Sequence, residues 1–347
     1  MRKRAVIVHR RTELEELLDR HSTRGQVEFF LKSRNRSLAE VQEVHDRHQE
    51  TLRVMRLAIP STWARTEVDR DSLSRFLFAP EDVIVVVGQD GLVANVAKYI
   101  DAQPVIGVNA APGRNPGVLV RCAAEQGVAA LRAFDEERHV ALEQLTMVRA
   151  EVDDTRSLTA LNEIFIGHAS HQSARYRISG GSSFEDQSSS GIVVSTGTGA
   201  TGWGASLVRG RSMGPLPTPV ERSLAWFVRE AWPSPTTGVT MTEGILKAGR
   251  ALEITVASDR LVVFGDGIGP LRSVMGTADP GWNRRADSCT GNPVKTSTSA
   301  GAQIVSLDAR RCCDASRPRV SVDRLRSPSL ANELTSSLRI SEDRLAV

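Results

Sequence analysis

Apolar runs and helical patterns alternate along the first 135 residues of the chain. Four runs are short and strongly apolar, as β-strands are. They occupy residues 4–9, 26–31, 82–87 and 104–108. Between them, Thr12 with Glu15 forms a capping box ahead of one helical pattern, and Ser37 with Glu40 precedes a longer one. The last two runs are apolar throughout, which is typical of a parallel sheet covered on both faces. The alternation predicts a doubly wound α/β domain over residues 1–135.

Beyond residue 135 the pattern changes to short apolar runs separated by turns, with few helical patterns between them. These runs lie within residues 141–152, 161–168, 174–178, 191–196 and 252–265. They predict a second domain over residues 136–269 that is rich in β-structure and resembles a β-sandwich. Residues 270–347 are different again, because they are rich in Ser, Arg and Pro and hold one aromatic residue, Trp282. With so little apolar surface to offset the entropy lost on ordering, this tail is expected to be disordered or poorly packed.

Charge and composition narrow the range of partners. The formal net charge is +3, but residues 270–347 hold 12 Lys and Arg against 8 Asp and Glu, which leaves 32 against 33 in the rest of the chain. A nearly neutral body offers no electrostatic footprint for nucleic acid. No apolar run reaches 18 residues, so we expect no membrane span. Four cysteines in 347 residues favour a reducing, cytoplasmic setting over a disulfide framework.

A glycine-rich turn, Gly88-Gln89-Asp90-Gly91, follows the apolar run at 82–87. It places a carboxylate at the predicted carboxyl end of a parallel strand, where α/β proteins bind ligands. The glycines permit a tight turn, and free N–H groups at the start of the next helix can hold phosphate oxygens. Taken alone, the stretch is better explained as an ordinary strand-to-helix turn with an Asp cap.

Two further motifs lie in the β-rich part of the chain. The loop at 196–202 alternates Thr196, Thr198 and Thr201 with glycines that include Gly199, so hydroxyls and backbone N–H groups can converge on a phosphate or a ribose. A purely structural loop rarely needs three threonines and three glycines in seven residues, so we favour ligand binding here. The pair Asn162-Glu163 offers donors and acceptors that could grip two ribose hydroxyls, or it could cap the strand that follows.

Together these motifs resemble the NAD kinase branch of the NAD kinase and diacylglycerol kinase superfamily. That branch carries Gly-Gly-Asp-Gly after a strand, then Asn-Glu, then a strand leading into Thr-Pro-Thr-Gly-Ser-Thr-Ala-Tyr. This chain has Gly-Gln-Asp-Gly, Asn-Glu and Thr-Gly-Thr-Gly-Ala-Thr-Gly-Trp in the same order. The stretch 104–119 and the Asp266-Gly267 turn within 262–268 also look like the family, so the resemblance covers residues 1 to about 268. The main departures are Gln89 for a glycine, Gly197 for a proline and Trp203 for a tyrosine.

The resemblance implies an ATP-dependent phosphotransferase that phosphorylates the 2′-hydroxyl of the adenosine ribose of NAD to give NADP, with Mg²⁺. Asp90 would accept the hydroxyl proton or help to hold Mg²⁺, since phosphoryl transfer depends mostly on positioning and charge stabilisation. Gly88, Gln89 and Gly91 would approach the donor phosphates. The residues that would hold NAD are Asn162, Glu163, Thr196, Thr198, Gly199 and Thr201.

Other functions stay open at this point. The substitution at Gln89 favours an NAD-binding protein with weak or no kinase activity, and the superfamily also includes kinases that act on lipids or other hydroxyl acceptors. No metal-ligating set of protein residues is expected, because the pair His45 and His48 and the pair His168 and His171 each lack a third ligand. The expected partners are small-molecule nucleotides and further copies of the chain in a homo-oligomer.

Overall fold

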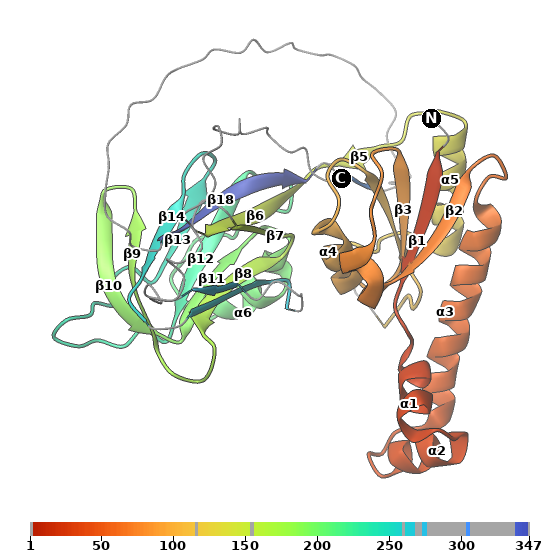
Figure 1. The fold of residues 1–347 in the computed structure, drawn as a ribbon, viewed down its shortest axis with the longest axis horizontal. Coiled ribbons are helices and arrows are strands. Elements are labelled where there is room, and N and C mark those ends of the chain that lie inside the picture. The colour runs from red at the N-terminus through yellow and green to blue at the C-terminus, as the bar shows by residue number, and fades with distance from the viewer. Residues whose placement is uncertain are drawn as a thin grey trace, which may run out of the picture.

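The computed structural model describes residues 3–114, 117–152, 156–258 and 261–267, together with three strands nearer the C-terminus, Ser273–Met275, Gln303–Val305 and Ser337–Leu345. These residues form one largely parallel sheet and two antiparallel sheets, joined by helices that lie mainly in the first half of the chain (Figure 1). The prediction of a mixed α/β protein is therefore confirmed.

Three of the predicted apolar runs form neighbouring strands of the parallel sheet. Its strands are β2 (Ala64–Asp69), β1 (Arg4–His9), β3 (Asp82–Gly88), β4 (Pro104–Asn109), β17 (Gln303–Val305) and β5 (Leu142–Glu143), in this spatial order. All neighbours are parallel except β17 and β5. Because β3 is buried at every position, side chains on both of its faces pack against other elements. Ile84 and Val86 pack with residues of α4 (Asp90–Ala97), whereas Val83 and Val85 pack with residues of α3 (Leu38–Ala58) and α5 (Ala124–Asp135).

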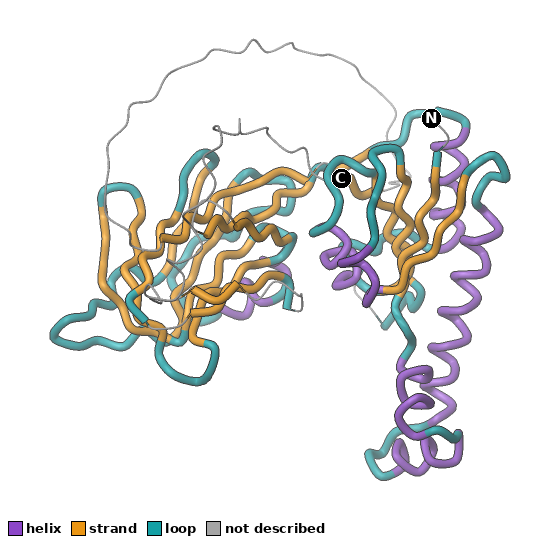
Figure 2. The backbone as a smooth tube through the Cα atoms, viewed as in Figure 1, coloured by secondary structure: helices purple, strands orange, loops and turns teal. Residues whose placement is uncertain are grey.

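Two short helices and the first half of α3 form a helical arm that extends away from the parallel sheet (Figure 2). The short helices are α1 (Glu13–His21), which begins with the predicted Thr12–Glu15 capping box, and α2 (Arg24–Lys32). The prediction of a strand at 26–31 is wrong, because these residues lie in α2. Thr23 caps this helix by accepting a hydrogen bond from the Gln26 N–H, and Val27 and Leu31, one helical turn apart, are buried against α1 and α3.

The second half of the chain forms two antiparallel sheets that share one hydrophobic core. One sheet contains, in spatial order, β10 (Ser183–Ser189), β9 (Ala174–Gly180), β14 (Leu252–Val256), β18 (Ser337–Leu345), β6 (Leu145–Val152) and β7 (Arg156–Ala160). The other contains β13 (Glu243–Lys247), β12 (Ser223–Arg229), β11 (Gly191–Ser195), β8 (Glu163–His168), β15 (Leu261–Gly265) and β16 (Ser273–Met275). This core contains Tyr176 and Ile254 from the first sheet. From the second sheet it contains Ile192 and Trp226. A short helix, α6 (Trp203–Val208), follows β11.

Three strands fall within residues 270–347, the tail for which the sequence predicts disorder or poor packing. β18 pairs along its length with β6 and over four residues with β14. Without it, the facing edges of β6 and β14 would present unpaired N–H and C=O groups. The other residues of this tail lie outside the described residues. Within the described part of the chain, no helix is long and apolar enough to cross a membrane.

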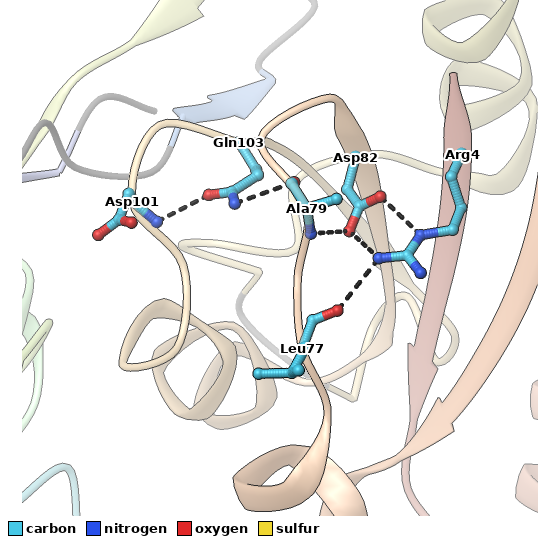
Figure 3. Close-up of polar contacts among 6 residues, drawn as sticks. All are labelled: Arg4, Leu77, Ala79, Asp82, Asp101 and Gln103. Carbon is cyan, nitrogen blue, oxygen red and sulfur yellow. Dashed lines mark hydrogen bonds and ion pairs between the residues drawn. The ribbon is translucent and has the colours of Figure 1, made fainter. Parts of the chain in front are cut away.

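An ion pair between the partly exposed Arg4 and the buried Asp82 fixes the amino-terminal end of the parallel sheet (Figure 3). Two nitrogens of the Arg4 guanidinium donate to the two carboxylate oxygens of Asp82, at 2.7 and 2.6 Å. Asp82 is completely buried and also accepts a hydrogen bond from the Ala79 N–H, at 2.7 Å. Gln103 extends the network by donating to the Ala79 carbonyl and accepting from the Asp101 N–H.

We expect Asp82→Ala to lower the free energy of unfolding by about 2–3 kcal/mol, the usual cost of removing hydrogen bonds to a charged group and leaving a donor unpaired. The cost should stay in this range because Arg4 remains partly exposed and can be hydrated. Urea denaturation measures the change, and Asp101→Asn, at an exposed position of the same network, is the matched control. A loss below 0.5 kcal/mol for Asp82→Ala would contradict this account.

Candidate functional site

In the turn between β3 and α4, glycine is required at position 88. Gly88 has φ 156°, a conformation that side chains with a Cβ rarely adopt. Gln89 is the N-cap residue of α4 with φ −119° and ψ 162°, which is ordinary extended backbone, and its side chain is exposed. The structure therefore requires glycine at position 88 and accepts glutamine at position 89 without backbone strain. Position 91 does not require glycine on steric grounds, since no atom would lie within 4 Å of a Cβ added to Gly91.

The Asp90 carboxylate is held by three backbone amides of the loop that follows β4. One oxygen accepts from the N–H groups of Leu119 (2.7 Å) and Val120 (2.9 Å), and the other accepts from that of Val118 (3.0 Å). An ionised carboxylate has about four acceptor sites, so one remains on the oxygen that faces Val118. Asp90 therefore fastens α4 to this loop and keeps one acceptor for a ligand.

A cavity of about 160 Å³ lies at the carboxyl ends of β1, β3 and β4. Gly88 and Gln89 line it, together with Arg10, His48 and Ala111 from neighbouring segments. We call it the Gln89 cavity. Asp90 and Gly91 are not among the lining residues, so the turn presents its first two residues to the cavity while the carboxylate faces the 118–120 loop.

The threonine-rich loop after β11 folds back onto the start of β8. The Thr196 hydroxyl donates to the Leu161 carbonyl (2.6 Å) and accepts from the N–H groups of Thr198 (3.1 Å) and Gly199 (3.2 Å). The Thr196 hydroxyl therefore uses its donor and both acceptor lone pairs in holding the loop. The loop is tight because a Cβ on Gly199 would lie 2.2 Å from the carbonyl oxygen of Asn162.

The other two threonines of the loop differ in what they offer. Thr201 is exposed, and its hydroxyl donates to the Thr198 carbonyl at 2.8 Å. Thr198 is 3% exposed, and its hydroxyl has no hydrogen-bond partner among the described residues. Thr198 therefore has a buried hydroxyl without a described partner, whereas the exposed Thr201 hydroxyl keeps its two acceptor lone pairs.

Asn162 and Glu163 meet two residues that lie far away in the sequence. Asp266 accepts hydrogen bonds from the N–H groups of Leu161 (3.1 Å) and Asn162 (2.7 Å), and its own N–H donates to the Glu163 carbonyl (3.1 Å). Lys98, at the end of α4, donates to the Gly265 carbonyl at 2.8 Å and lies 4.0 Å from an Asp266 oxygen. The side chains of Lys98 and Asp266 are 7% and 1% exposed, so this is a buried cluster of charges between α4 and the antiparallel sheet.

Burial dominates the electrostatics of this cluster. It raises the pKa of Glu163 from 4.5 to about 7, and the nearby Asp266 charge adds to this shift while Lys98 opposes it. Burial likewise raises the pKa of Asp266 and lowers that of Lys98. Each direction disfavours charge, as expected where a group loses its hydration. Glu163 is therefore close to half-protonated at neutral pH.

We expect Glu163→Gln to remove a pH-dependent loss of stability. Because the pKa of Glu163 is higher in the folded protein, its stabilising proton is fully bound below about pH 4.5 and is lost as the pH rises through about 7. At about 1.36 kcal/mol per pKa unit, the loss in the wild-type protein amounts to roughly 3 kcal/mol. Urea denaturation between pH 5 and 8 should show the wild-type protein losing stability relative to Glu163→Gln. Glu253→Gln, on an exposed position of β14, should follow the wild-type profile; parallel profiles for all three proteins would refute the assignment.

The predicted site residues thus form two groups at opposite ends of α4. Gly88, Gln89, Asp90 and Gly91 lie at its start, whereas the group at its end combines the Asn162-Glu163 pair, the threonine loop and Asp266 around Lys98. The helix spans eight residues, or about 12 Å. Lys98 lies outside every motif in the sequence and directly follows the largely buried helix α4.

Within the described residues, no group of three or more His, Cys, Asp or Glu side chains could hold a metal ion. His48 is buried on α3 beside His9, with ring centroids 6.5 Å apart. In comparisons with known proteins, no protein-family model matches the chain and no curated protein sequence matches it significantly.

Proposed function

We propose that the protein is an NAD kinase-like phosphotransferase that uses ATP to phosphorylate the 2′-hydroxyl of the adenosine ribose of NAD. The observation that carries the proposal is the convergence of three motifs that are far apart in the sequence. Asn162-Glu163, the loop at 196–199 and Asp266 are joined by backbone and side-chain hydrogen bonds at the end of the helix that begins with Gly88-Gln89-Asp90-Gly91. The pairing of β8 with β11 and β15, in which Glu163 lies opposite Ser195 and Ile164 lies opposite Gly265, brings these motifs to one edge of the sheet.

The proposal includes the finer fold and setting that the resemblance implies. The chain would combine a doubly wound α/β domain over residues 1–135 with a β-sandwich-like domain over residues 136–269, and would act as a cytoplasmic homo-oligomer. The proposed acceptor site uses Asn162 and Glu163 to hold the dinucleotide, with Thr198 supplying a hydroxyl that has no other described partner. Gly199 lets the loop approach Asn162 closely, and Thr201 holds the loop in its turn.

Asp90 is the proposed catalytic residue. Its three amide contacts hold the carboxylate in one orientation, and its remaining acceptor site could take the proton of the attacking hydroxyl. Mg²⁺ usually keeps several waters and binds through one or two carboxylates plus substrate phosphates. One remaining acceptor site on Asp90 fits this limited role, in which the ion would offset phosphate charge. Gly88 and Gln89 would lie beside the donor phosphates.

The amide contacts of Asp90 also favour a second function. A carboxylate that already accepts three backbone hydrogen bonds serves well as a structural tie between α4 and the 118–120 loop. On this basis the chain would bind NAD with weak or no kinase activity. Kinase activity on a lipid or another hydroxyl acceptor remains the third alternative, and the Asn162-Glu163 pair favours a ribose over a lipid.

One experiment separates these functions. Purified protein is incubated with Mg²⁺, ATP and NAD, and NADP is measured enzymatically while NAD binding is followed by calorimetry. NADP formation that depends on both substrates supports the kinase. NAD binding without NADP supports the second function, and ATP turnover only with a diacylglycerol vesicle supports the third. A protein that neither binds NAD nor forms NADP would overturn the first two.

A further inference from the structure

Part of the Gln89 cavity is lined by residues that lie outside the glycine-rich and threonine-rich motifs. Arg10 follows β1, and His48 comes from the middle of α3. Opposite them, Gly88 and Gln89 lead into α4. The cavity therefore brings together three elements at the carboxyl edge of the parallel sheet, where ligands bind in α/β folds.

Arg10 is a half-buried cation that makes no ion pair or hydrogen bond with any described residue. The Glu13 carboxylate lines the Gln89 cavity as well, and its pKa is lowered first by Arg36 and also by the charge of Arg10. The neighbours of Arg10 are used differently: Arg11 pairs with Asp19, and Glu13 pairs with Arg36. Arg10 also lines a second cavity of about 280 Å³, whose other lining residues include Asp19, Asp69 and Asp71. A guanidinium in this position is suited to an anion with several acceptor oxygens.

His48 supplies a second unused polar group. It is 7% exposed, it lines the cavity, and its Nε2 has no hydrogen-bond partner within the described part of the chain. Burial and the nearby His9 lower its pKa to about 4, so the ring is neutral at neutral pH. A neutral imidazole can carry its proton on Nε2 and donate it, which removes the cost of a buried unpaired nitrogen.

On the α4 side the cavity is lined by Gly88 and Gln89, whereas Asp90 and Gly91, whose N–H groups begin the helix, do not line it. The volume of about 160 Å³ is below the 300–1,000 Å³ range of pockets that enclose a drug-sized ligand. The cavity thus suits a phosphate group rather than a whole nucleotide.

We propose that the Gln89 cavity binds a phosphate group, with Arg10 as the countercharge and His48 Nε2–H as a hydrogen-bond donor. This inference rests on the proposed function in one respect, since it identifies the phosphate as part of the polyphosphate donor. The remainder of the donor lies outside the cavity. Arg10 and His48 are then binding residues for the donor, and Asp90, which faces the opposite way, stays with the acceptor hydroxyl.

Calorimetry with tripolyphosphate, which has no base or sugar, tests the site without requiring catalysis. We expect Arg10→Met to raise the Kd for tripolyphosphate by about tenfold or more, as for loss of a charge-assisted hydrogen bond. His48→Leu should raise it by a smaller factor, and His48→Gln, which retains an N–H donor, should recover part of the loss. Arg65→Met removes an exposed arginine of β2 and should leave Kd unchanged. Circular dichroism confirms that each variant is folded.

The outcomes separate this inference from the kinase proposal. Absence of tripolyphosphate binding, or an equal loss in Arg10→Met and Arg65→Met, overturns the phosphate site. If the wild-type protein forms NADP and Arg10→Met has an unchanged KM for ATP, the site fails while the kinase stands. If Arg10→Met loses tripolyphosphate binding but the wild-type protein forms no NADP, the phosphate site stands and the kinase proposal fails. Inorganic phosphate binding with the same dependence on Arg10, but no effect of ATP on it, would show that the source is free phosphate and overturn its identification as the donor.

Discussion

Lys98→Met should destabilise the protein by about 3–5 kcal/mol above neutral pH, the scale expected when one partner of a buried ion pair is removed. Lys98 and Asp266 are almost completely buried, and Glu163 adds a second carboxyl to the same cluster. Without the ammonium group, two acidic side chains share a site that has little hydration. Methionine fills a similar volume, so the loss reports charge rather than packing.

The pH dependence of this loss identifies its origin. At pH 5 the carboxyl groups can take up protons and avoid the unpaired charge, so Lys98→Met should cost less there than at pH 8. Urea denaturation at both pH values measures the difference. Lys247→Met, at an exposed position of β13, should change stability by less than about 0.5 kcal/mol at either pH. An equal loss at pH 5 and pH 8 would assign Lys98 to packing alone.

Asp90→Asn should lower turnover by about 10² or more and should also lower stability by about 1–3 kcal/mol. The first effect follows from the proposed role of Asp90 in accepting a proton. The second follows from the three backbone amides that donate to its oxygens, because an asparagine NH₂ would face one of these donors and leave it unsatisfied. This stability loss is absent from an analysis of the sequence alone, in which Asp90 is an isolated carboxylate.

The two effects are measured separately, by NADP formation at saturating substrates and by urea denaturation. Asp101→Asn, at an exposed position just beyond the end of α4, is the control and should change neither. Full turnover in a destabilised Asp90→Asn would assign Asp90 to structure and favour the NAD-binding function without catalysis. Unchanged stability would contradict the observed amide contacts.

Much of the fold could be predicted from the sequence because local patterns determine it. The run at 4–9 coincides with β1, and those at 82–87 and 104–108 each lie one residue short of the ends of β3 and β4. The failure at 26–31 is instructive, since a six-residue apolar run fits a strand or one face of a short helix equally well. Tertiary packing of Val27 and Leu31 decided between them.

The site was predicted less completely because its parts depend on contacts between distant residues. The motifs identified Asn162-Glu163 and the threonine loop, but no local pattern indicates that Thr196 is fully hydrogen-bonded while the Thr198 hydroxyl is not. Lys98 becomes significant only when α4 packs near Asp266, 168 positions later in the chain. Arg10 and His48 likewise become neighbours only when β1 and α3 pack together.

The helical arm has a thermodynamic consequence for the Gln89 cavity. Its small apolar cluster, formed by Leu14, Leu17, Val27, Leu31 and Val41, comes only from α1, α2 and the first half of α3. Farther along α3, Leu52 and Met55 belong instead to the core of the parallel sheet. A unit with so small a core can unfold locally while the sheet stays intact, and its amide protons then exchange with solvent sooner than those of β1 or β3. Since Arg10 and His48 flank this unit, a phosphate bound between them would slow that exchange, and the order of the arm and the occupancy of the cavity become one linked equilibrium.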